Sequence, residues 1–431
     1  MSSVRRSVVV LPLLFCAVAC AVACVAACAV GCASAQTSSA PAAATEGRAV
    51  ASASSSPGAS GASSAAAASA ETPPPKCRYA VRRLSASGSG ALRPQVASSA
   101  DGFAVAWEET TDHRSIRVQT FGADAQPLGS SIEVADVGKA AAAPRIAAGA
   151  DGDGFAVFWS SAHGDTSSAI YFRKIDRAGK PRSDAIPVVV IPGARALDAL
   201  ATDSGYALAW WNWSGTPHQI AVTFLDKSGH PVGKPVSLSR APVSDPTVDL
   251  ANLPAPSGAP PAPAIAWDEA AADGDHVFVS APFRERLDHR IDLGPGEAPS
   301  VGGAAVVWQR ASDTSIWMAA VDGSPPLRVT DGHLPAAAPR RPGVSAFCWL
   351  RDTDPSEAHH VDELQCGNLV AGAQLLSPTR VAVEPRGIFD LHVAALGERT
   401  GATWVSQQDD DTGVSFAVVT CPGVAVAKAR P

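Results

Sequence analysis

Helical periodicity and charged residues are both scarce in this sequence. Only 17% of its 431 residues are charged and 6% are aromatic. Beyond the N-terminal region, apolar residues do not recur with the 3.6-residue spacing of an amphipathic helix but form short runs interrupted by Gly, Pro and Asp. These absences argue against a helical protein, and the short apolar runs predict an all-β fold.

The short motifs of common enzyme classes are missing as well. After the N-terminal segment the chain contains no GxSxG, HExxH, P-loop or dinucleotide-type GxGxxG motif. Their absence excludes little, because an enzyme built from repeated units can gather its catalytic residues from several of them.

The sequence also lacks an excess of positive charge. Its formal net charge is −7, and loss of an N-terminal segment containing Arg5 and Arg6 would change it to −9, because no Asp or Glu precedes Glu46. An acidic domain repels the phosphate backbone of DNA or RNA. We therefore expect no nucleic-acid partner.

Residues 1–35 have the features of a membrane-targeting signal. Arg5 and Arg6 precede an uncharged apolar run from Val8 to Ala33. A short basic region followed by an apolar region is the order found in such signals. The sequence therefore predicts export from the cytoplasm.

The end of this segment allows three outcomes. "VAAC", Val25–Cys28, resembles the bacterial lipobox, in which a cysteine after small residues is lipidated and becomes the new N-terminus, and "AVGC", Ala29–Cys32, is similar. Cys28 and Cys32 are therefore candidate lipid anchors. Alternatively, "ASA" before Gln36 serves as the cleavage site of a secreted protein, or the apolar run stays uncleaved and spans the membrane.

A linker follows the signal. Residues 36–75 are rich in Ser, Ala, Pro and Gly, as in "SSSPGASGASSAAAASAETPPP", and contain too few large apolar residues to offset the entropy of an ordered chain. We expect a disordered tether that holds a folded body, residues 76–422, away from the membrane, with residues 423–431 as a C-terminal tail.

A short pattern recurs through the folded body. Apolar runs such as "GFAVAW", "GFAVFW" and "GYALAW" each end in a tryptophan, and successive tryptophans lie 52, 51, 57, 41, 41 and 55 residues apart. The seven tryptophans are Trp107, Trp159, Trp210, Trp267, Trp308, Trp349 and Trp404.

The first three copies share a complete unit around the tryptophan. A strand such as "PQVASS" leads into an Asp/Gly turn, and after the tryptophan come a polar loop, a strand such as "IRVQTF", a Pro/Gly turn and a last strand. This order predicts an antiparallel meander of four strands. Such a sheet cannot bury both faces alone, so it must stack on its neighbours. The tryptophan is then expected to fill the gap between successive sheets.

This arrangement resembles the seven-bladed β-propellers found in many secreted bacterial repeat proteins, in which the closing blade contains both ends of the chain. The resemblance concerns the fold and implies no catalytic residue. The last four copies differ considerably from the first three, so six or eight blades remain alternatives. "CRYAVRRLS", Cys77–Ser85, precedes the first copy, and in a closed ring it would complete the last blade.

Four cysteines remain in the folded body, and in an oxidising compartment they allow three pairings. Cys348 and Cys366 lie on the two arms of one hairpin and are natural partners. If the N-terminal strand completes the last blade, Cys77 lies next to Cys421. Free thiols or a metal site are the alternatives, although no C-x-x-C spacing indicates zinc.

Aspartates follow most of the tryptophan-bearing strands, which predicts an acidic rim on one face. This rim is either a solvated edge in which Asp serves turn geometry or a surface for a cationic partner or Ca²⁺. In residues 351–363, His359 and His360 offer a weaker transition-metal alternative. The candidate ligand-face residues are Asp112, Asp165, Asp273, Asp275, Asp313, Asp352, Asp354, Asp409, Asp410 and Asp411.

Two acidic pairs directly follow tryptophans. Glu108 with Glu109 and Asp268 with Glu269 could supply the acid and the nucleophile of a glycosidase. They belong to the first and fourth copies, which lie roughly opposite each other in a ring of seven. The required separation of about 5 to 10 Å is therefore reached only if both pairs extend to the axis.

The sequence as a whole favours a non-catalytic binding or scaffold protein outside the cytoplasm. We expect a monomeric bacterial lipoprotein that presents its acidic loop face to a protein, a glycan or another envelope component, with no cofactor other than possible Ca²⁺. The alternative is a carbohydrate-active hydrolase or lyase, which would need several carboxylates converging on the centre of the ring. A third interpretation is a purely structural envelope component.

Overall fold

The computed structural model describes residues 76–422 except 112, 136–140, 164–166, 215–217, 241–242, 244, 255–260, 284–288, 304, 311, 354–360 and 409–410. The predicted signal, the candidate anchors Cys28 and Cys32, the linker and the C-terminal tail therefore lie outside the described residues. Within the described part of the chain, no helix is long and apolar enough to cross a membrane.

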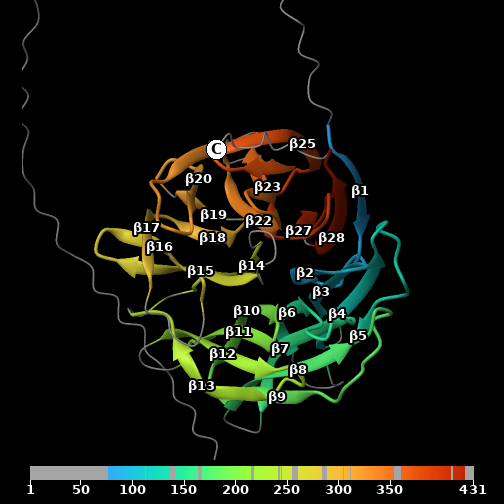
Figure 1. The fold of residues 1–431 in the computed structure, drawn as a ribbon. Coiled ribbons are helices and arrows are strands. Elements are labelled where there is room, and N and C mark those ends of the chain that lie inside the picture. The colour runs from blue at the N-terminus through green and yellow to red at the C-terminus, as the bar shows by residue number, and fades with distance from the viewer. Residues whose placement is uncertain are drawn as a thin grey trace, which may run out of the picture. The chain divides into compact units, whose positions relative to one another are not determined.

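The described residues form 28 strands in seven sheets, each of four antiparallel strands (Figure 1). The strands of the first four sheets are β2 (Leu92–Ser99), β3 (Gly102–Thr110), β4 (Arg114–Gly122), β5 (Ile132–Glu133); β6 (Ala141–Ala148), β7 (Phe155–His163), β8 (Ser167–Ile175), β9 (Ile186–Ile191); β10 (Ala194–Thr202), β11 (Gly205–Asn212), β12 (Gln219–Asp226), β13 (Pro231–Ser237); β14 (Val248–Leu253), β15 (Ala262–Ala271), β16 (Gly274–Ser280) and β17 (Ile291–Pro295).

The last three sheets complete a ring, so the fold is a seven-bladed β-propeller, and we number the sheets as blades 1 to 7 in chain order. Their strands are β18 (Glu297–Val301), β19 (Ala305–Arg310), β20 (Ser315–Ala320), β21 (Leu327–Asp331); β22 (His333–Arg341), β23 (Val344–Asp352), β24 (Asp362–Val370), β25 (Gln374–Glu384); β26 (Ile388–Leu396), β27 (Arg399–Gln408), β28 (Asp411–Thr420) and β1 (Arg78–Arg83).

Packing between blades forms the core. The buried residues divide into seven hydrophobic clusters, and each cluster contains one repeat tryptophan together with residues of two adjacent blades. In the cluster around Trp107, for example, Phe121 of blade 1 contacts Phe416 of blade 7 with ring centroids 4.6 Å apart. The tryptophans thus lie between successive sheets, where the sequence places them.

The two ends of the folded unit meet in blade 7. Strand β1 pairs antiparallel with β28, with Arg78 opposite Thr420, so the N-terminal strand completes the last blade as predicted. Cys77 forms a disulfide with Cys421 directly beyond this pairing, and Cys348 forms one with Cys366 across the β23–β24 hairpin. Both predicted disulfides are present. Because disulfides form in oxidising compartments, they indicate a protein located outside the cytoplasm.

Hydrogen bonds from side chains to the backbone also connect neighbouring blades. The first strand of six blades carries a bulge near its start. At four of these strands, in blades 2, 3, 5 and 6, the side chain after the tryptophan of the preceding blade accepts a hydrogen bond from a backbone N–H near the bulge. Glu108 accepts from Ala143, and Asp268 accepts from Ala298. Both alanines have positive φ. Where the residue after the tryptophan is polar, it therefore has a structural role between blades.

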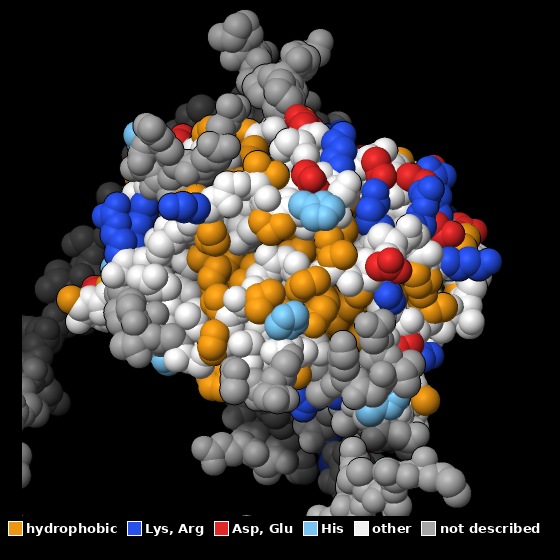
Figure 2. Space-filling model, turned by 90° about the horizontal axis from the view of Figure 1, so that it is seen from below, with side chains coloured by type: hydrophobic (Ala, Val, Ile, Leu, Met, Phe, Trp, Pro, Cys, Tyr) orange, Lys and Arg blue, Asp and Glu red, His pale blue; other side chains and the backbone are white. Residues whose placement is uncertain are grey.

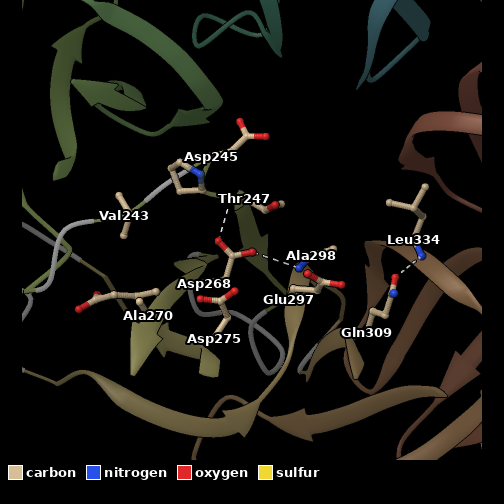
Figure 3. A pocket seen from close by; sticks show the side chains of 12 residues that line it. Val243, Asp245, Thr247, Asp268, Ala270, Asp275, Glu297, Ala298, Gln309 and Leu334 are labelled. Atoms are coloured by element: carbon tan, nitrogen blue, oxygen red, sulfur yellow. Dashed lines mark hydrogen bonds between the residues drawn. The ribbon is translucent and has the colours of Figure 1, made fainter. Parts of the chain in front are cut away.

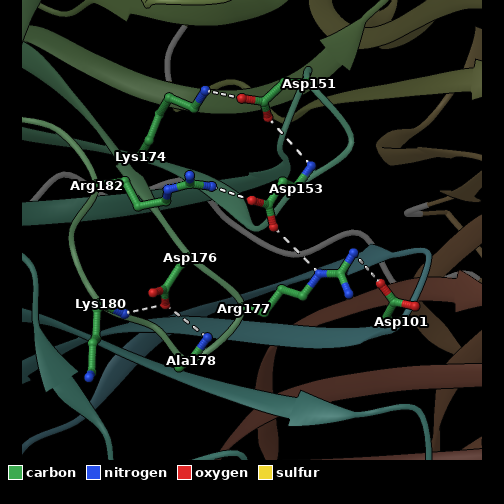
Figure 4. A network of polar contacts seen from close by, with 9 residues as sticks. All are labelled: Asp101, Asp151, Asp153, Lys174, Asp176, Arg177, Ala178, Lys180 and Arg182. Carbon is green, nitrogen blue, oxygen red and sulfur yellow. Dashed lines mark hydrogen bonds and ion pairs between the residues drawn. The ribbon is translucent and has the colours of Figure 1, made fainter.

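Many of the remaining aspartates shape turns at the other end of the blades. Figure 4 shows Asp176 accepting hydrogen bonds from the N–H groups of Ala178 and Lys180, both 2.9 Å long, and Asp226 makes the same contacts in the next blade. Arg177 joins blades 1 and 2 by pairing with Asp101 at 2.6 Å. These aspartates are explained by turn geometry.

The side of the propeller seen in Figure 2 carries both hydrophobic and charged side chains. Figure 2 looks at the side on which β9 and β13 lie in Figure 1, and hydrophobic side chains gather in the middle of that view with charged ones toward its edges. Val190 of β9 and Val232 of β13 are about half exposed. Apolar side chains at this level of exposure are common on soluble proteins.

The two disulfides should contribute unequally to stability. The Cys77–Cys421 bond spans 344 residues and the Cys348–Cys366 bond 18. Chain-entropy arguments therefore predict that the Cys77→Ala/Cys421→Ala double variant loses about 2 to 3 kcal/mol more unfolding free energy than Cys348→Ala/Cys366→Ala. Urea denaturation of both double variants measures the difference, and equal losses would contradict a closing role for the first bond.

Candidate functional site

The face at which the tryptophan-bearing strands end carries the connections between blades as well, and we call it the loop face. Of the predicted ligand-face residues, Asp112, Asp165, Asp354, Asp409 and Asp410 lie outside the described residues, as do His359 and His360.

The described aspartates of this set do not converge on one point. Asp411 pairs with Arg83 at 2.9 Å, Asp273 pairs with His276 at 3.0 Å, and Asp313 accepts a hydrogen bond from Ser315. Asp352 also has a bonded partner. Asp275 is the member of this set that lines a pocket.

That pocket, which we call the acidic pocket, lies between blades 4 and 5 and has a volume of about 440 Å³. Its five acidic lining residues are Asp245, Asp268, Glu269, Asp275 and Glu297. Figure 3 shows Asp268 and Asp275 next to each other, with Asp245 and Glu297 further out. They come from the connection before β14, from β15 and β16, and from the start of β18.

Backbone groups hold the Asp268 carboxylate in place. It accepts hydrogen bonds from the N–H groups of Thr247, at 2.8 Å, and Ala298, at 3.2 Å. Burial raises the pKa of Asp268 to about 6, and the nearby negative charge of Asp275 acts in the same direction. Among the described residues that line the pocket there is no Lys, Arg or His. Asp268 therefore changes charge close to neutral pH without a cation of its own in the pocket.

The neighbouring glutamates are already engaged. Glu269 is buried and accepts hydrogen bonds from Trp267 at 3.1 Å and from Arg290 at 2.9 Å. Glu108 is equally buried and pairs with Arg93 at 2.9 Å. Glu109 lies 3.5 Å from Arg117. In each ion pair both residues belong to the same blade. Of the four carboxylates in the two predicted glycosidase pairs, Asp268 is therefore the one that has no arginine partner among the described residues.

The described residues contain no group of three or more His, Cys, Asp or Glu side chains that could hold a metal ion. The carboxylates of the acidic pocket are too spread out for that purpose. A ligand that meets several of them has to be larger than a single ion.

A second polar group, not predicted from the sequence, surrounds the centre of the ring. The first strands of all seven blades line a channel of about 260 Å³. At equivalent positions six of these strands carry a polar side chain, and we call this set the collar: Gln95, Arg145, Asp198, Asp249, Ser300 and His392.

Much of the collar satisfies the backbone of the next blade. The Asp198 carboxylate accepts from the N–H of Leu250 at 2.6 Å, and the Asp249 carboxylate accepts from the N–H of Val301 at 2.5 Å. The hydroxyl of Ser300 donates to Asp249 at 2.8 Å. The first strand of each blade is a sheet edge, so its N–H groups need partners from outside its own sheet.

The charges within the collar balance one another. Burial raises the pKa of Asp198 well above its usual range and also raises the pKa of Asp249, and the two side chains hydrogen-bond to each other. Two buried carboxyls in contact disfavour a second negative charge, so we expect the pair to share a proton, and the positive charge of Arg145 lies near Asp198. Burial lowers the pKa of His392 to about 3, so its imidazole is neutral and lies 2.5 Å from the Gln95 amide nitrogen.

Part of the collar is marked in the sequence by a preceding proline. Pro94–Gln95, Pro144–Arg145 and Pro299–Ser300 occupy the same position in three copies, so a polar residue after proline recurs inside an apolar strand. The other members lack the proline.

Comparisons with known proteins extend only to the fold. No family model and no curated protein matches the chain. One similar solved structure is a subtype N10 neuraminidase-like protein of A/little yellow-shouldered bat/Guatemala, with 10% identity and a TM-score of 0.46 over 81% of this chain and 100% of that chain. A second is the β-propeller domain of the Trilobed protease from Pyrococcus furiosus, with 9% identity and a TM-score of 0.43 over 78% of this chain and 94% of that chain. A third is a Penicillium chrysogenum α-L-arabinanase complexed with arabinobiose, with 10% identity and a TM-score of 0.42 over 69% of this chain and 93% of that chain.

The shared proton predicts how stability depends on pH. The ordinary pKa of an Asp carboxyl is 3.8. A raised pKa means that the folded protein keeps a proton that the unfolded chain releases, so the unfolding free energy falls as pH rises through the folded pKa. Asp249→Asn retains an acceptor for Val301 and can donate to Asp198 without a shared proton. Thermal unfolding between pH 5 and pH 9 should show a smaller loss of Tm for this variant than for the wild type.

Asp249→Ala is the matched control for this experiment. It leaves the buried N–H of Val301 without its acceptor and should cost roughly 1 to 3 kcal/mol at every pH. An Asp249→Asn variant whose Tm falls with pH as steeply as that of the wild type would show that the pair does not share a proton.

Proposed function

We propose that this protein is a lipid-anchored, non-catalytic binding propeller whose acidic pocket takes a cationic group of a partner, such as a Lys or Arg side chain of an envelope protein or the amine of another envelope component. The observation that carries the proposal is the pocket of five carboxylates, with no Lys, Arg or His among its described lining residues.

Size and charge favour an organic cation. A pocket of about 440 Å³ has room for an ammonium or guanidinium group with part of its aliphatic chain. Carboxylates that are partly removed from water make strong charge-assisted hydrogen bonds with such groups. Asp268, held by two backbone N–H groups, would be the fixed partner, and the more exposed Asp245 would lie at the rim.

Several contacts support binding over carbohydrate hydrolysis. A retaining or inverting glycosidase keeps its two carboxyl groups about 5 to 10 Å apart to make room for the sugar or a water. The carboxyl groups that reach the channel, Asp198 and Asp249, are bonded to each other and to the backbone. Glu108 and Glu269 are held by arginines.

The anchoring part of the proposal rests on the sequence and on the disulfides. Export is consistent with the two disulfides. A lipidated cysteine followed by the linker of residues 36–75 would hold the propeller at a distance from the membrane while leaving the loop face accessible.

Mass spectrometry of the protein made in a bacterial host tests the anchor. We expect a diacylglyceryl-modified N-terminus at Cys28 and loss of membrane association in Cys28→Ser. If lipid is found at Cys32 instead, Cys32→Ser should abolish it. A mature N-terminus at Gln36 without lipid would contradict the anchored form and indicate a secreted protein.

Binding of a lysine-rich peptide tests the acidic pocket. Calorimetry at pH 7.5 should show binding that weakens about tenfold in Asp268→Asn and in Glu297→Gln, a change of about 1.4 kcal/mol. Because the pKa of Asp268 is about 6, affinity should fall as the pH drops from 7.5 to 5 and this carboxyl becomes protonated.

Asp203→Asn is the control. Asp203 is an exposed residue in the turn between β10 and β11, at the end opposite the loop face, and its substitution removes one negative charge without touching the pocket. If Asp203→Asn weakens peptide binding as much as Asp268→Asn does, binding depends on net charge and the pocket is not the site.

A further inference from the structure

A second hollow lies on the loop face, over blades 1 to 3. It has a volume of about 530 Å³ and contains arginines, serines and an indole where the acidic pocket has carboxylates. We call it the serine hollow; its polar and aromatic lining residues are Arg93, Ser160, Ser161, Ser167, Ser168, Arg195, Trp213 and Ser214.

Trp213 does not belong to the seven tryptophans that separate the blades. It follows β11, and 55% of its surface is exposed, whereas each repeat tryptophan is at most 7% exposed. Its backbone N–H donates to the carbonyl of Gly193 at 3.3 Å. A side chain on Gly193, which has a φ of +70°, would come within 2.4 Å of the Ser214 hydroxyl. The backbone at Trp213 and Ser214 therefore packs closely against Gly193, while the indole of Trp213 remains exposed to solvent.

Arg195 supplies a cation with unused donors. Its nearest partner is Asp245, at 3.6 Å, and the Asp245 side chain is 89% exposed. An exposed pair of this length contributes little energy. Burial lowers the pKa of Arg195, and the proximity of Arg93 lowers it further. A guanidinium beside another guanidinium, with one loose partner, is well suited to receive a carboxylate in a bidentate contact.

Two of the three acidic groups near Arg195 have other partners. Glu108 is already shared between Arg93 and Arg114, at 2.9 and 3.0 Å. Asp390 accepts from the backbone N–H of Arg93 at 3.3 Å. Only the loose contact with Asp245 would have to yield to a ligand.

Some serine hydroxyls of the hollow bond to the protein backbone, and others have no partner among the described residues. The hydroxyl of Ser168 bridges the carbonyl of Ile191 and the N–H of Ala194, and Ser160 accepts from the N–H of Ala196. In the part of the chain that the structure describes, the hydroxyls of Ser167 and Ser214 have no hydrogen-bond partner. They can therefore bond to a ligand without breaking a contact of the fold.

From this combination we propose that the serine hollow binds an acidic saccharide. Its carboxylate pairs with Arg195, the apolar face of a sugar ring packs on Trp213, and sugar hydroxyls bond to Ser167 and Ser214. Inorganic anions would use the guanidinium but not the indole, and neutral sugars would use the indole but not the guanidinium. The presence of both in one hollow favours a ligand that has both features.

The experiment compares three ligands on the full-length protein by calorimetry: a uronic-acid trisaccharide, a neutral trisaccharide of matched linkage, and inorganic phosphate. We expect the acidic trisaccharide to bind at least tenfold more tightly than either of the others. Arg195→Ala and Trp213→Ala should each weaken it at least tenfold, and saturation should change the tryptophan fluorescence of the wild type but not of Trp213→Ala.

Matched controls separate the hollow from general effects. Arg177→Ala removes an exposed arginine and Tyr79→Ala an exposed aromatic, both outside the hollow, and neither should change the affinity. Asp268→Asn should bind the acidic trisaccharide normally, because the acidic pocket is not involved. The proposal is overturned if no acidic saccharide binds at millimolar concentration, if phosphate or the neutral sugar binds equally well, or if Trp213→Ala retains full affinity.

Discussion

Each four-stranded blade of this protein has two apolar faces and cannot remove either from water without a neighbour. The seven hydrophobic clusters all lie between adjacent blades, and each is built around one tryptophan. A linear stack would leave one face open at each end. Closure through the pairing of β1 with β28, fixed by the Cys77–Cys421 bond, gives blade 7 a neighbour on both sides. The ring is therefore a requirement of burial.

The same closure creates a second requirement at the axis. Seven sheet edges face one narrow channel, and their N–H groups must be paired there. Asp198 and Asp249 accept from N–H groups of the next blade, and burial raises the pKa of both carboxyls. Glu108 and Asp268 perform a similar role nearer the loop face. Buried carboxylates in this protein thus arise largely from architecture, which is why their burial and their raised pKa values do not by themselves indicate catalysis.

Specific function has to depend on residues that the blades do not share. The acidic pocket and the serine hollow both lie on the loop face, but over different blades and with opposite chemistry. Arg195 and Asp245, which pair loosely with each other, belong one to each site.

The sequence by itself determined the parts that repeat or are local. The spacing of the tryptophans defined the blades, the hairpin position of Cys348 and Cys366 defined one disulfide, and the unpaired strand at Cys77 defined the closure and the other disulfide, because strand patterns and turn residues act over short distances. Sequence pattern also placed aspartates on the loop face, but of those described only Asp275 lines the acidic pocket. Asp245, Glu297, the collar and the hollow around Trp213 became visible only in the tertiary structure. The two sites each combine residues of consecutive blades, and the collar combines residues from around the ring, so only the packing of the blades brings their members together.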